Sequence, residues 1–514
     1  MLLVDHFERT ARENPGQTFV HFVQDDAQSD VKLTYAEAQE RAAHFAALLK
    51  GLGVRRGEPV ALLVPNSAEW LVYYFGCQKI GAVASGLNTD LRVGELKGFL
   101  ETINPRVLVT TAALNALAQE LRTVSPGIRH ILSDAPAGDM LDASARSPEP
   151  MLARDPTLDD DALLSIVFTS GTTGARPKAA LQRSSSIING IAGYQEHVRL
   201  TADDRIMLVT PLFHGSALNW GTTMAVLAGA PIVLAARFSA SRFWGQADRG
   251  GATVLWTMGA IAVILLGMPV SDVEKRASAR LRILFANGAG GRWRQVKERW
   301  DCGVLDGYGS TETPGTLASA DCYDLPDPYP CLGRPVKGVA LRIVDPETGA
   351  DVAVREVGEI VSRFGQGFAG YFNNEAALEE AVRDGWFHTG DLAYHDEENR
   401  YFFVDRLKSI IRRGGENISS FEIENLVVQH PEVHEAIALP KAHDVLGETV
   451  FLGLVPLQPG RSFTLEEIHD FVRDHLAPFK WPEEVRTLDP ATIPRTESGK
   501  VKKLLLRQAL GLTR

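Results

Sequence analysis

The sequence predicts an α/β protein: a large N-terminal domain of two helix-covered mixed sheets and a small β subdomain, followed by a small α+β C-terminal domain. The chain has 514 residues, which is more than one domain usually holds. Its 45% hydrophobic and 23% charged residues are ordinary for a soluble globular protein. Apolar runs alternate with amphipathic stretches, a pattern typical of parallel strands covered by helices.

Helix and strand signals alternate through the first part of the chain. Thr34 and Glu37 form a capping box that opens a helix running toward residues 51–53. Later patterns predict a helix at residues 68–80 and strands at residues 60–64, 107–109 and 131–132. Residues 133–161 are rich in proline, alanine and aspartate without an apolar period, which predicts a surface connection.

The alternation then resumes and predicts a second βα series. Its elements are a helix at residues 184–198 and strands at residues 206–209, 232–235, 254–256 and 281–285. Residues 339–364 change to short β segments around a turn at 345–349, which predicts the β subdomain. Beyond Arg406, the α+β domain is predicted from a helix near residues 422–429, strands at 436–439 and 450–455, and a helix capped by Thr464 and Glu467.

Charge and cysteine content narrow the function classes. The net charge of −11 argues against nucleic acids and anionic membranes as general partners, because both are negatively charged and bind proteins with a positive surface. The first sixteen residues scatter charges through short apolar pieces, which fits neither a signal peptide nor a membrane span, so a cytoplasmic location is expected. No CxxC pair or zinc spacing occurs, which predicts reduced structural thiols at Cys77, Cys302, Cys322 and Cys331.

A polar, glycine-punctuated loop, FTSGTTGARPK at residues 168–178, follows an apolar run that predicts a buried strand. Gly171 and Gly174 would let backbone amides approach a ligand, and the hydroxyls and Lys178 add donors and positive charge. The spacing differs from the P-loop and from the dinucleotide fingerprint. We interpret these residues as a phosphate cradle, the alternative being an ordinary surface loop.

Later stretches carry compatible chemistry. The sequence Tyr-Gly-Ser-Thr-Glu at residues 308–312 offers an aromatic face for a purine, hydroxyls for phosphate, and a carboxylate for Mg²⁺. A tight turn at residues 385–391 ends in Asp391, which could hold a ribose diol. Further on come Asp-Arg-Leu-Lys at 405–408, Arg-Arg-Gly-Gly-Glu-Asn at 412–417 and Ser-Gly-Lys at 498–500.

Together these stretches resemble the adenylate-forming superfamily of acyl-CoA synthetases, luciferases and peptide-synthetase adenylation domains, over residues 33–507. The local pattern is most similar to the carnitine/crotonobetaine and medium-chain CoA ligase group. The resemblance implies an N-terminal domain at residues 1–405 and a mobile C-terminal domain at 406–514, with the hinge near Lys408. It implies ATP and Mg²⁺ as cofactors and CoA as co-substrate.

The resemblance also assigns roles to matching residues. Glu312 and Thr169 would hold the metal, Asp391 and Arg406 the ribose, and Gly415 would line the pantetheine tunnel. The catalytic residues would be Lys500, Glu312 and His214. The remaining implied nucleotide contacts are Ser170, Gly171, Thr172, Thr173, Gly174, Lys178, Gly288, Ala289, Tyr308, Gly309, Ser310 and Thr311.

The implied reaction has two steps at one site. A carboxylate oxygen attacks the α-phosphorus of ATP and expels pyrophosphate, with Mg²⁺, Lys178 and Lys500 as electrostatic clamps. The CoA thiol then displaces AMP, after the C-terminal domain has rotated to exchange Lys500 for the loop at residues 414–415. Arg412 and Arg413 are candidates for attracting the nucleotide end of CoA; a solvated basic edge is the alternative.

A separate stretch bears on the substrate. Residues 211–216 resemble the segment that faces the acyl pocket in acyl-CoA synthetases, where a histidine gates access. No aspartate follows before residue 219, which disfavours an α-amino acid, and Trp220 would shorten the pocket and favour a small, medium or aromatic acid. The predicted pocket residues are His214, Asn219, Trp220, Thr223, Trp256, Asn287, Gly309 and Thr313.

Three positions depart from the family's pattern. Ala179 stands in place of a glycine, residues 183–185 in place of a histidine-containing segment, and Ser420 in place of a frequent proline. The second departure lies near the predicted site and leaves the substrate class open. The leading hypothesis is an acyl-CoA ligase, monomeric or homodimeric, that acts on a small-molecule acid and CoA.

Three alternatives stay open. The same adenylation chemistry could act on an unusual oxyacid, such as nitrite in an ATP-dependent diazotase, or the adenylate could pass to an acceptor other than CoA. A silent nucleotide-binding scaffold would be expected to lack Glu312 or Lys500, and both are present.

Overall fold

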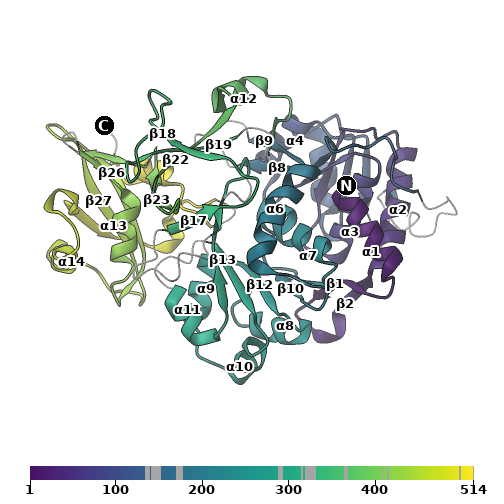
Figure 1. The fold of residues 1–514 in the computed structure, drawn as a ribbon, viewed down its shortest axis with the longest axis horizontal. Coiled ribbons are helices and arrows are strands. Elements are labelled where there is room, and N and C mark those ends of the chain that lie inside the picture. Colours follow the sequence, from purple (N-terminus) through teal and green to yellow (C-terminus); the bar gives the residue numbers. More distant parts are fainter. Residues whose placement is uncertain are drawn as a thin grey trace.

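The computed structural model describes residues 1–133, 139–140, 152–169, 177–287, 293–313, 317–318, 331–363, 368–407, 409–413, 416–496 and 499–512. In this part of the chain the strands form four sheets. Figure 1 shows the two large helix-covered sheets on the side of the N-terminus and the last sheet on the opposite side. The third sheet, which contains β17, β22 and β23, lies between them (Figure 1).

The first sheet has eight strands in the order β20-β9-β8-β4-β3-β5-β6-β7. The β8–β9 and β9–β20 pairs are antiparallel and the others are parallel, so the sheet is mixed, as predicted. Its strands are β3 (Pro59–Leu63), β4 (Val83–Gly86), β5 (Val107–Thr110), β6 (His130–Ser133), β7 (Asp139–Met140), β8 (Leu163–Thr169), β9 (Lys178–Arg183) and β20 (Phe368–Tyr371).

Alternating residues of these strands serve two cores. Val60 and Leu62 pack with helices α2 (Tyr35–Gly51) and α3 (Ala68–Lys79). Ala61 and Leu63 pack on the other face with α4 (Val93–Ile103) and α5 (Asn115–Val124). Helices therefore cover both faces, as expected for a sheet of largely parallel strands.

The second sheet has the order β14-β13-β12-β10-β11-β1-β2, parallel except for β2. Its strands are β1 (Thr18–Val23), β2 (Val31–Thr34), β10 (Ile206–Leu208), β11 (Ile232–Ala235), β12 (Val254–Met258), β13 (Ile283–Asn287) and β14 (Gly303–Leu305). Its helices are α6 (Ser184–Val198), α7 (Thr223–Ala228), α8 (Phe243–Gly250), α9 (Gly259–Leu266), α10 (Asp272–Ser278) and α11 (Trp293–Trp300). Residues of α6 and α7 join the core that also contains α2 and α3, so one core connects the two sheets.

The third sheet is the predicted β subdomain, in the order β15-β16-β17-β23-β22-β19-β18 with β21 beside β22. Its strands are β15 (Gly307–Tyr308), β16 (Leu317–Ala318), β17 (Cys331–Pro335), β18 (Leu341–Val344), β19 (Gly358–Arg363), β21 (Val382–Arg383), β22 (Trp386–His395) and β23 (Tyr401–Arg406). Helix α12 (Glu375–Ala381) precedes β21.

The C-terminal sheet has the order β25-β24-β27-β26, with β28 beside β27. Its strands are β24 (Ile411–Arg413), β25 (Glu416–Ile418), β26 (Val433–His443), β27 (Gly447–Pro456) and β28 (Glu484–Thr487). Helices α13 (Ser420–Val427) and α14 (Leu465–Val472) cover one face, and α15 (Lys503–Ala509) covers the other. This confirms the predicted α+β arrangement.

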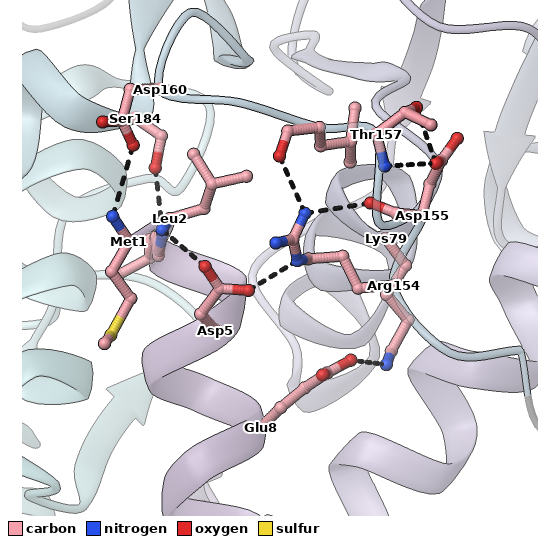
Figure 2. Close-up of polar contacts among 12 residues, drawn as sticks. Met1, Leu2, Asp5, Glu8, Lys79, Arg154, Asp155, Thr157, Asp160 and Ser184 are labelled. Carbon is pink, nitrogen blue, oxygen red and sulfur yellow. Dashed lines mark hydrogen bonds and ion pairs between the residues drawn. The ribbon is translucent and has the colours of Figure 1, made fainter.

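The structure adds an N-terminal anchor that the sequence did not indicate (Figure 2). Helix α1 (Leu3–Glu13) begins where the Leu3 N–H donates to Ser184 Oγ over 2.9 Å. One turn further, Glu8 pairs with Lys79, whose side chain is 0% exposed. Burial lowers the pKa of Lys79 and Glu8 opposes that shift, so the pair holds a charge inside the protein and fixes α1 against α3.

Several local predictions can be judged directly. The helix opened by Thr34 and the helix at residues 184–198 are confirmed. The predicted surface connection at 133–161 contains a short strand, β7, and its residues 134–138 and 141–151 lie outside the described residues. The helices that the structure describes all fall short of the length and apolarity that a membrane crossing requires.

The cysteine prediction needs a correction. Cys77 and Cys302 are free and buried, as expected. Cys331 is disulfide-bonded, so the expectation of reduced thiols is wrong at this position. Its partner lies outside the described residues. A spacing rule could not find this bond, because the rule searches for metal and redox motifs.

Candidate functional site

The predicted site residues come from strand ends and the loops that follow them. Thr169 ends β8, His214 follows β10, and Arg406 ends β23. In open α/β sheets, ligands bind beyond the carboxyl ends of the strands. The architecture therefore favours the location that the sequence indicated.

The structure describes the two ends of the phosphate cradle. Thr169 and Lys178 are register partners in the antiparallel β8–β9 pair, and Thr169 Oγ1 donates to the Lys178 carbonyl over 3.5 Å. Lys178 Nζ lies 5.1 Å from the centroid of the Tyr371 ring, a cation–π contact. Residues Ser170, Gly171, Thr172, Thr173 and Gly174 lie outside the described residues.

Glu312 is held from both sides. Tyr371, on β20, donates to Glu312 Oε1 over 3.0 Å, and Ser310 Oγ donates to Glu312 Oε2 over 3.1 Å. The turn is closed by Thr313, whose N–H donates to Ser310 Oγ over 3.1 Å. Each carboxylate oxygen accepts one of these bonds and keeps lone-pair capacity, so the carboxylate fits a role as Mg²⁺ ligand.

Strand β9 supports the same turn. Gln182 is fully buried, and its Nε2 donates to the Thr311 carbonyl over 2.6 Å. Gln182 and Lys178 lie on one face of β9, because alternate residues of a strand share a face. Neither Gln182 nor Tyr371 was among the residues predicted for the site from the sequence. The sequence signal for Gln182 was a single amide after the apolar residues 179–181.

Asp391 is a buried carboxylate that contacts two other predicted site residues. Tyr308 Oη donates to Asp391 Oδ2 over 2.7 Å, and Arg406 Nε lies 3.1 Å from Asp391 Oδ1. Asp391 is 3% exposed, and its burial raises the pKa of its carboxyl group while Arg406 and Tyr308 oppose that shift. The predicted adenine contact and both predicted ribose contacts are thus joined by direct contacts.

The turn that carries Asp391 is fixed by β19. Glu359 Oε1 accepts from the Gly390 N–H over 2.8 Å, and Glu359 Oε2 lies 2.7 Å from His388 Nδ1. Thr389 Oγ1 donates to the Ile360 carbonyl over 2.7 Å and accepts from the Asp391 N–H over 3.1 Å. A position so fully hydrogen-bonded is set before any ligand binds.

Lys500 reaches this region from the C-terminal sheet's side of the molecule. Its side chain is exposed to solvent, and its backbone N–H donates to Thr496 Oγ1 over 3.1 Å. The surrounding protein atoms and the Arg406 charge lower the pKa of Lys500, whereas Asp391 raises it. Lys500 therefore lies within electrostatic reach of the two predicted ribose residues, and its contact with a ligand stays a prediction.

His214 also lies within electrostatic reach of Lys500. Burial and the Lys500 charge lower the pKa of His214 to about 4. Its Nδ1 accepts from the Ser216 N–H over 3.2 Å. A neutral ring with Nδ1 as acceptor carries its proton on Nε2, so His214 is a hydrogen-bond donor at neutral pH.

Three aromatic residues that come later in the chain than His214 form a stack: Trp220, Trp256 and Phe285. The rings of Trp220 and Trp256 have centroids 6.0 Å apart at 21°, and those of Trp256 and Phe285 are 3.9 Å apart at 12°. Tyr194 meets Trp220 edge-on at 4.9 Å. Trp220 belongs to a π-helical turn, η3 (Ser216–Thr222), a feature frequent at functional sites. Phe285 and Tyr194 carried no sequence signal.

Of the other predicted pocket residues, some are buried in the protein and some lie outside the described residues. Asn219 is 2% exposed and accepts from Ser165 Oγ over 3.0 Å, and Thr223 is fully buried. Their contact with an acid stays a prediction, as does that of Gly309 and of Asn287, at the end of β13. Gly288, Ala289, Lys408 and Gly415 lie outside the described residues.

The departure at residues 183–185 has a structural explanation. Ser184 Oγ accepts from the Leu3 N–H, the bond that begins α1. Ser185 Oγ donates to the Asp160 carbonyl over 2.7 Å, and Arg183 Nε lies 3.6 Å from Asp161 Oδ1. These side chains anchor the N-terminal helix and the segment before β8.

The two arginines of β24, Arg412 and Arg413, differ in their contacts. Arg413 donates to the Phe479 carbonyl over 2.5 Å and pairs with Glu483, so its charge is already matched. Arg412 is exposed. Attraction of an anionic ligand would therefore fall mainly to Arg412.

Comparison with known proteins gives consistent results. Residues 7–372 match the family described as AMP-binding enzyme, and residues 422–500 match the AMP-binding enzyme C-terminal domain. An indoleacetate–CoA ligase of Aromatoleum aromaticum is 32% identical over 513 residues, covering 99% of this chain and 98% of the relative. A crotonobetaine/carnitine–CoA ligase of Shigella flexneri is 31% identical and covers 91% of this chain and 92% of its own.

The fold is similarly matched among solved structures. ATP-bound MatB from Rhodopseudomonas palustris superposes with a TM-score of 0.86 at 26% identity, and covers 99% of both chains. The likeness thus extends across the N-terminal sheets and the C-terminal sheet together.

Proposed function

The chain belongs to the AMP-binding enzyme family and is an AMP-forming acid–thiol ligase, and on this premise we propose that it converts a flat aromatic carboxylic acid to its CoA thioester. The aromatic stack beside His214 carries this proposal. The relative named for indoleacetate supports it, because an indole presents a flat ring of the kind that stacks on tryptophan.

The chemistry of the side chains favours an acid without a second charge. Trp220, Trp256 and Phe285 are apolar surfaces, and His214 is neutral because its pKa is about 4. A betaine would be held best by aromatic faces arranged around its ammonium group. The rings here are nearly parallel instead, which suits a planar group lying along Trp220.

In the first step, a carboxylate oxygen forms a bond to the α-phosphorus of ATP, and the bond to the bridging oxygen breaks to release pyrophosphate. Lys178 and Lys500 counter the charge that builds on the phosphate oxygens. Asp391, supported by Tyr308 and Arg406, orients the ribose. Mg²⁺, held through Glu312, would supply further positive charge against the phosphates.

In the second step, the CoA sulfur forms a bond to the acyl carbon, the carbon–oxygen bond breaks, and AMP leaves. His214 donates from Nε2 and so acts on access and polarity near the acyl group, whereas the thiol proton passes to water. The hinge near Lys408 and the exchange of Lys500 for Gly415 remain part of this proposal.

The test measures AMP release with ATP and Mg²⁺, with and without CoA, across a panel of acids. The panel contains indoleacetate, phenylacetate, benzoate, a medium-chain fatty acid and crotonobetaine, together with nitrite plus an arylamine. We expect the highest kcat/KM, stimulated by CoA, with an aromatic acid. Preference for the fatty acid or crotonobetaine would contradict the proposed substrate class, and nitrite-dependent AMP would favour the oxyacid alternative.

A substitution of Trp220 tests whether the aromatic stack determines the preference for an aromatic acid. Trp220→Leu should lower kcat/KM for the aromatic acid by about 10-fold relative to the aliphatic acid, on the scale of losing one aromatic contact and its buried area. Trp386→Leu is the control, since Trp386 lies on β22 beneath Arg342 and Arg363, outside the aromatic stack. An equal effect of both substitutions would count against the stack as the acid's contact.

A further inference from the structure

Ser420 lies where the C-terminal sheet's helices meet the rest of the protein. We infer that Ser420 is a positioning residue that holds helix α13 against β23 and thereby keeps Lys500 in the adenylation site. This inference rests on the proposed function, because Lys500 serves adenylation there. It concerns a residue that never touches the substrate.

Hydrogen bonds from the start of α13 converge on one carboxylate oxygen of β23. Asp405 Oδ2 accepts from the Ser420 N–H over 2.6 Å, from Ser420 Oγ over 2.9 Å and from the Phe421 N–H over 3.2 Å. Ser419 Oγ adds a bond to the Val404 carbonyl over 2.6 Å. The carboxylate therefore caps a helix that belongs to the other sheet, with both side chains buried.

The same hydroxyl also contacts the helix that follows Lys500 in the chain. Lys503 Nζ donates to Ser420 Oγ over 2.7 Å and lies 2.8 Å from Glu424 Oε1. Lys503 is the first residue of α15, which begins just after the loop that carries Lys500. Ser420 thus links Asp405 on β23 to the helix that supports the Lys500 loop.

The identity of residue 420 decides whether this link exists. Proline has neither an N–H nor a hydroxyl. A proline here would therefore remove the two bonds that Ser420 itself makes to Asp405, and also the acceptor for Lys503. Proline would still suit the first position of a helix, where no intrahelical N–H bond is required. The departure from the family's frequent proline therefore adds contacts without being needed for α13 to form.

The contacts bias the two steps of the reaction differently. The chain passes from the third sheet to the C-terminal sheet between Asp405 and Ser420, so a rotation in that stretch separates these residues. Their bonds therefore favour the arrangement seen here, with Lys500 near Asp391 and His214. Losing one typical hydrogen bond would raise the population of the rotated form by about 5-fold while that form is in the minority.

The test compares the half-reactions of Ser420→Ala and Ser420→Pro with those of the wild type. Thioester formation from supplied acyl-AMP and CoA should rise by up to ~5-fold in Ser420→Ala, and further in Ser420→Pro, because it requires the rotated form. Acyl-AMP formation from acid and ATP should fall by less than about 2-fold, because the form seen here stays the major one. The control is Thr464→Ala, which removes the N-terminal cap of α14, a helix that packs on the same sheet as α13.

General destabilisation would slow both half-reactions, and it cannot accelerate one of them. An unchanged ratio of the two rates in Ser420→Ala and Ser420→Pro, or a ratio shifted equally by Thr464→Ala, would overturn the inference.

A distance measurement separates this inference from the proposed substrate. Fluorophores on Glu379→Cys and Arg473→Cys, exposed positions on α12 and after α14, would report the arrangement by energy transfer without any acid or CoA. Ser420→Pro should change the transfer distribution relative to Thr464→Ala. If no acid in the panel yields AMP while this change is seen, the proposed function fails and the positioning role stands; an unchanged distribution overturns the role.

Discussion

Asp391 and Lys500 are both charged groups that are expected to contact the nucleotide, and the structure holds them in different ways. Asp391 is 3% exposed and contacts Tyr308 and Arg406 from two other strands. Lys500 is exposed, and its backbone N–H and carbonyl make hydrogen bonds to Thr496 Oγ1 and the Thr496 N–H. The aspartate is fixed by contacts with neighbouring strands, whereas we propose that the lysine is brought to the nucleotide by the position of the C-terminal sheet.

This difference suggests a division of labour. A group used in both steps gains from being fixed in advance, because its ordering cost is met during folding. A group required in only one step must be removable. Substitutions of Asp391 should therefore affect both half-reactions, and substitutions of Lys500 only the first.

The largest effect is expected for Lys500→Ala. Acyl-AMP formation should fall by at least about 10²-fold, on the scale of losing one electrostatic donor in a transition state. Thioester formation from supplied acyl-AMP should stay within about 2-fold of the wild type, because the proposed rotation removes Lys500 from the site. Single-turnover assays of each step measure this, and equal losses in both steps would remove the proposed division.

Asp391→Asn should have the next largest effect. Loss of a charged hydrogen bond to the ribose, about 1.5–3 kcal/mol, predicts a KM for ATP raised ~10-fold or more, and weaker acyl-AMP binding to match. Asp396→Asn is the matched control, since Asp396 is a buried carboxylate of the same hairpin that pairs with Arg400. If Asp391→Asn impaired only adenylation, Asp391 would behave like Lys500, and this would contradict the proposed use of Asp391 in both steps.

Tyr371→Phe should produce a smaller and more selective change. Removing the hydroxyl that donates to Glu312 over 3.0 Å loosens the proposed metal ligand and should raise the Mg²⁺ concentration for half-maximal pyrophosphate exchange by ~3–5-fold. Tyr394→Phe, a ring stacked on Phe402 in the β22–β23 pair, serves as control. The same shift in both variants would argue against a role for Tyr371 at Glu312.

The smallest effect concerns pH and stability. The pKa of His214 is about 4 in the folded protein, below its ordinary value of 6.5, so the unfolded chain binds the extra proton first. The contribution of His214 to stability is therefore present above about pH 6.5 and is lost as pH falls toward 4.

Thermal unfolding of wild type and His214→Gln between pH 4 and 7 measures this difference. The wild type should lose Tm more steeply with acid, and Lys500→Ala should reduce the difference because the neighbouring charge lowers the His214 pKa. Parallel curves for wild type and His214→Gln would show that His214 titrates normally.

Local signals in the sequence predicted the elements that depend on local chemistry. The capping box at Thr34 and the helix of residues 184–198 follow from side chains within one or two turns. Strand β1 and helix α1 were missed because their partners, β11 and Ser184, are distant in sequence. Pairing over such separations leaves no periodic trace that a single sequence can show.

The candidate site shows the same limit. Tyr308, Asp391 and Arg406 were identified from motifs, and the structure joins them directly. Gln182 and Tyr371 were missed, because each acts on the Glu312 turn through one contact between remote strands. Supporting residues of this kind are defined by the fold, whereas ligand-facing residues follow the chemistry of the ligand.

The central claim is that the acid is activated through its own oxygen on the α-phosphate of ATP. Turnover of the preferred acid, labelled with ¹⁸O in both carboxylate oxygens, tests this by mass spectrometry of the AMP released in the presence of CoA. The account predicts that each AMP carries one ¹⁸O, because the carbon–oxygen bond breaks when the thioester forms. AMP without the label, together with thioester formation, would show that the acid never formed an adenylate and would contradict the account.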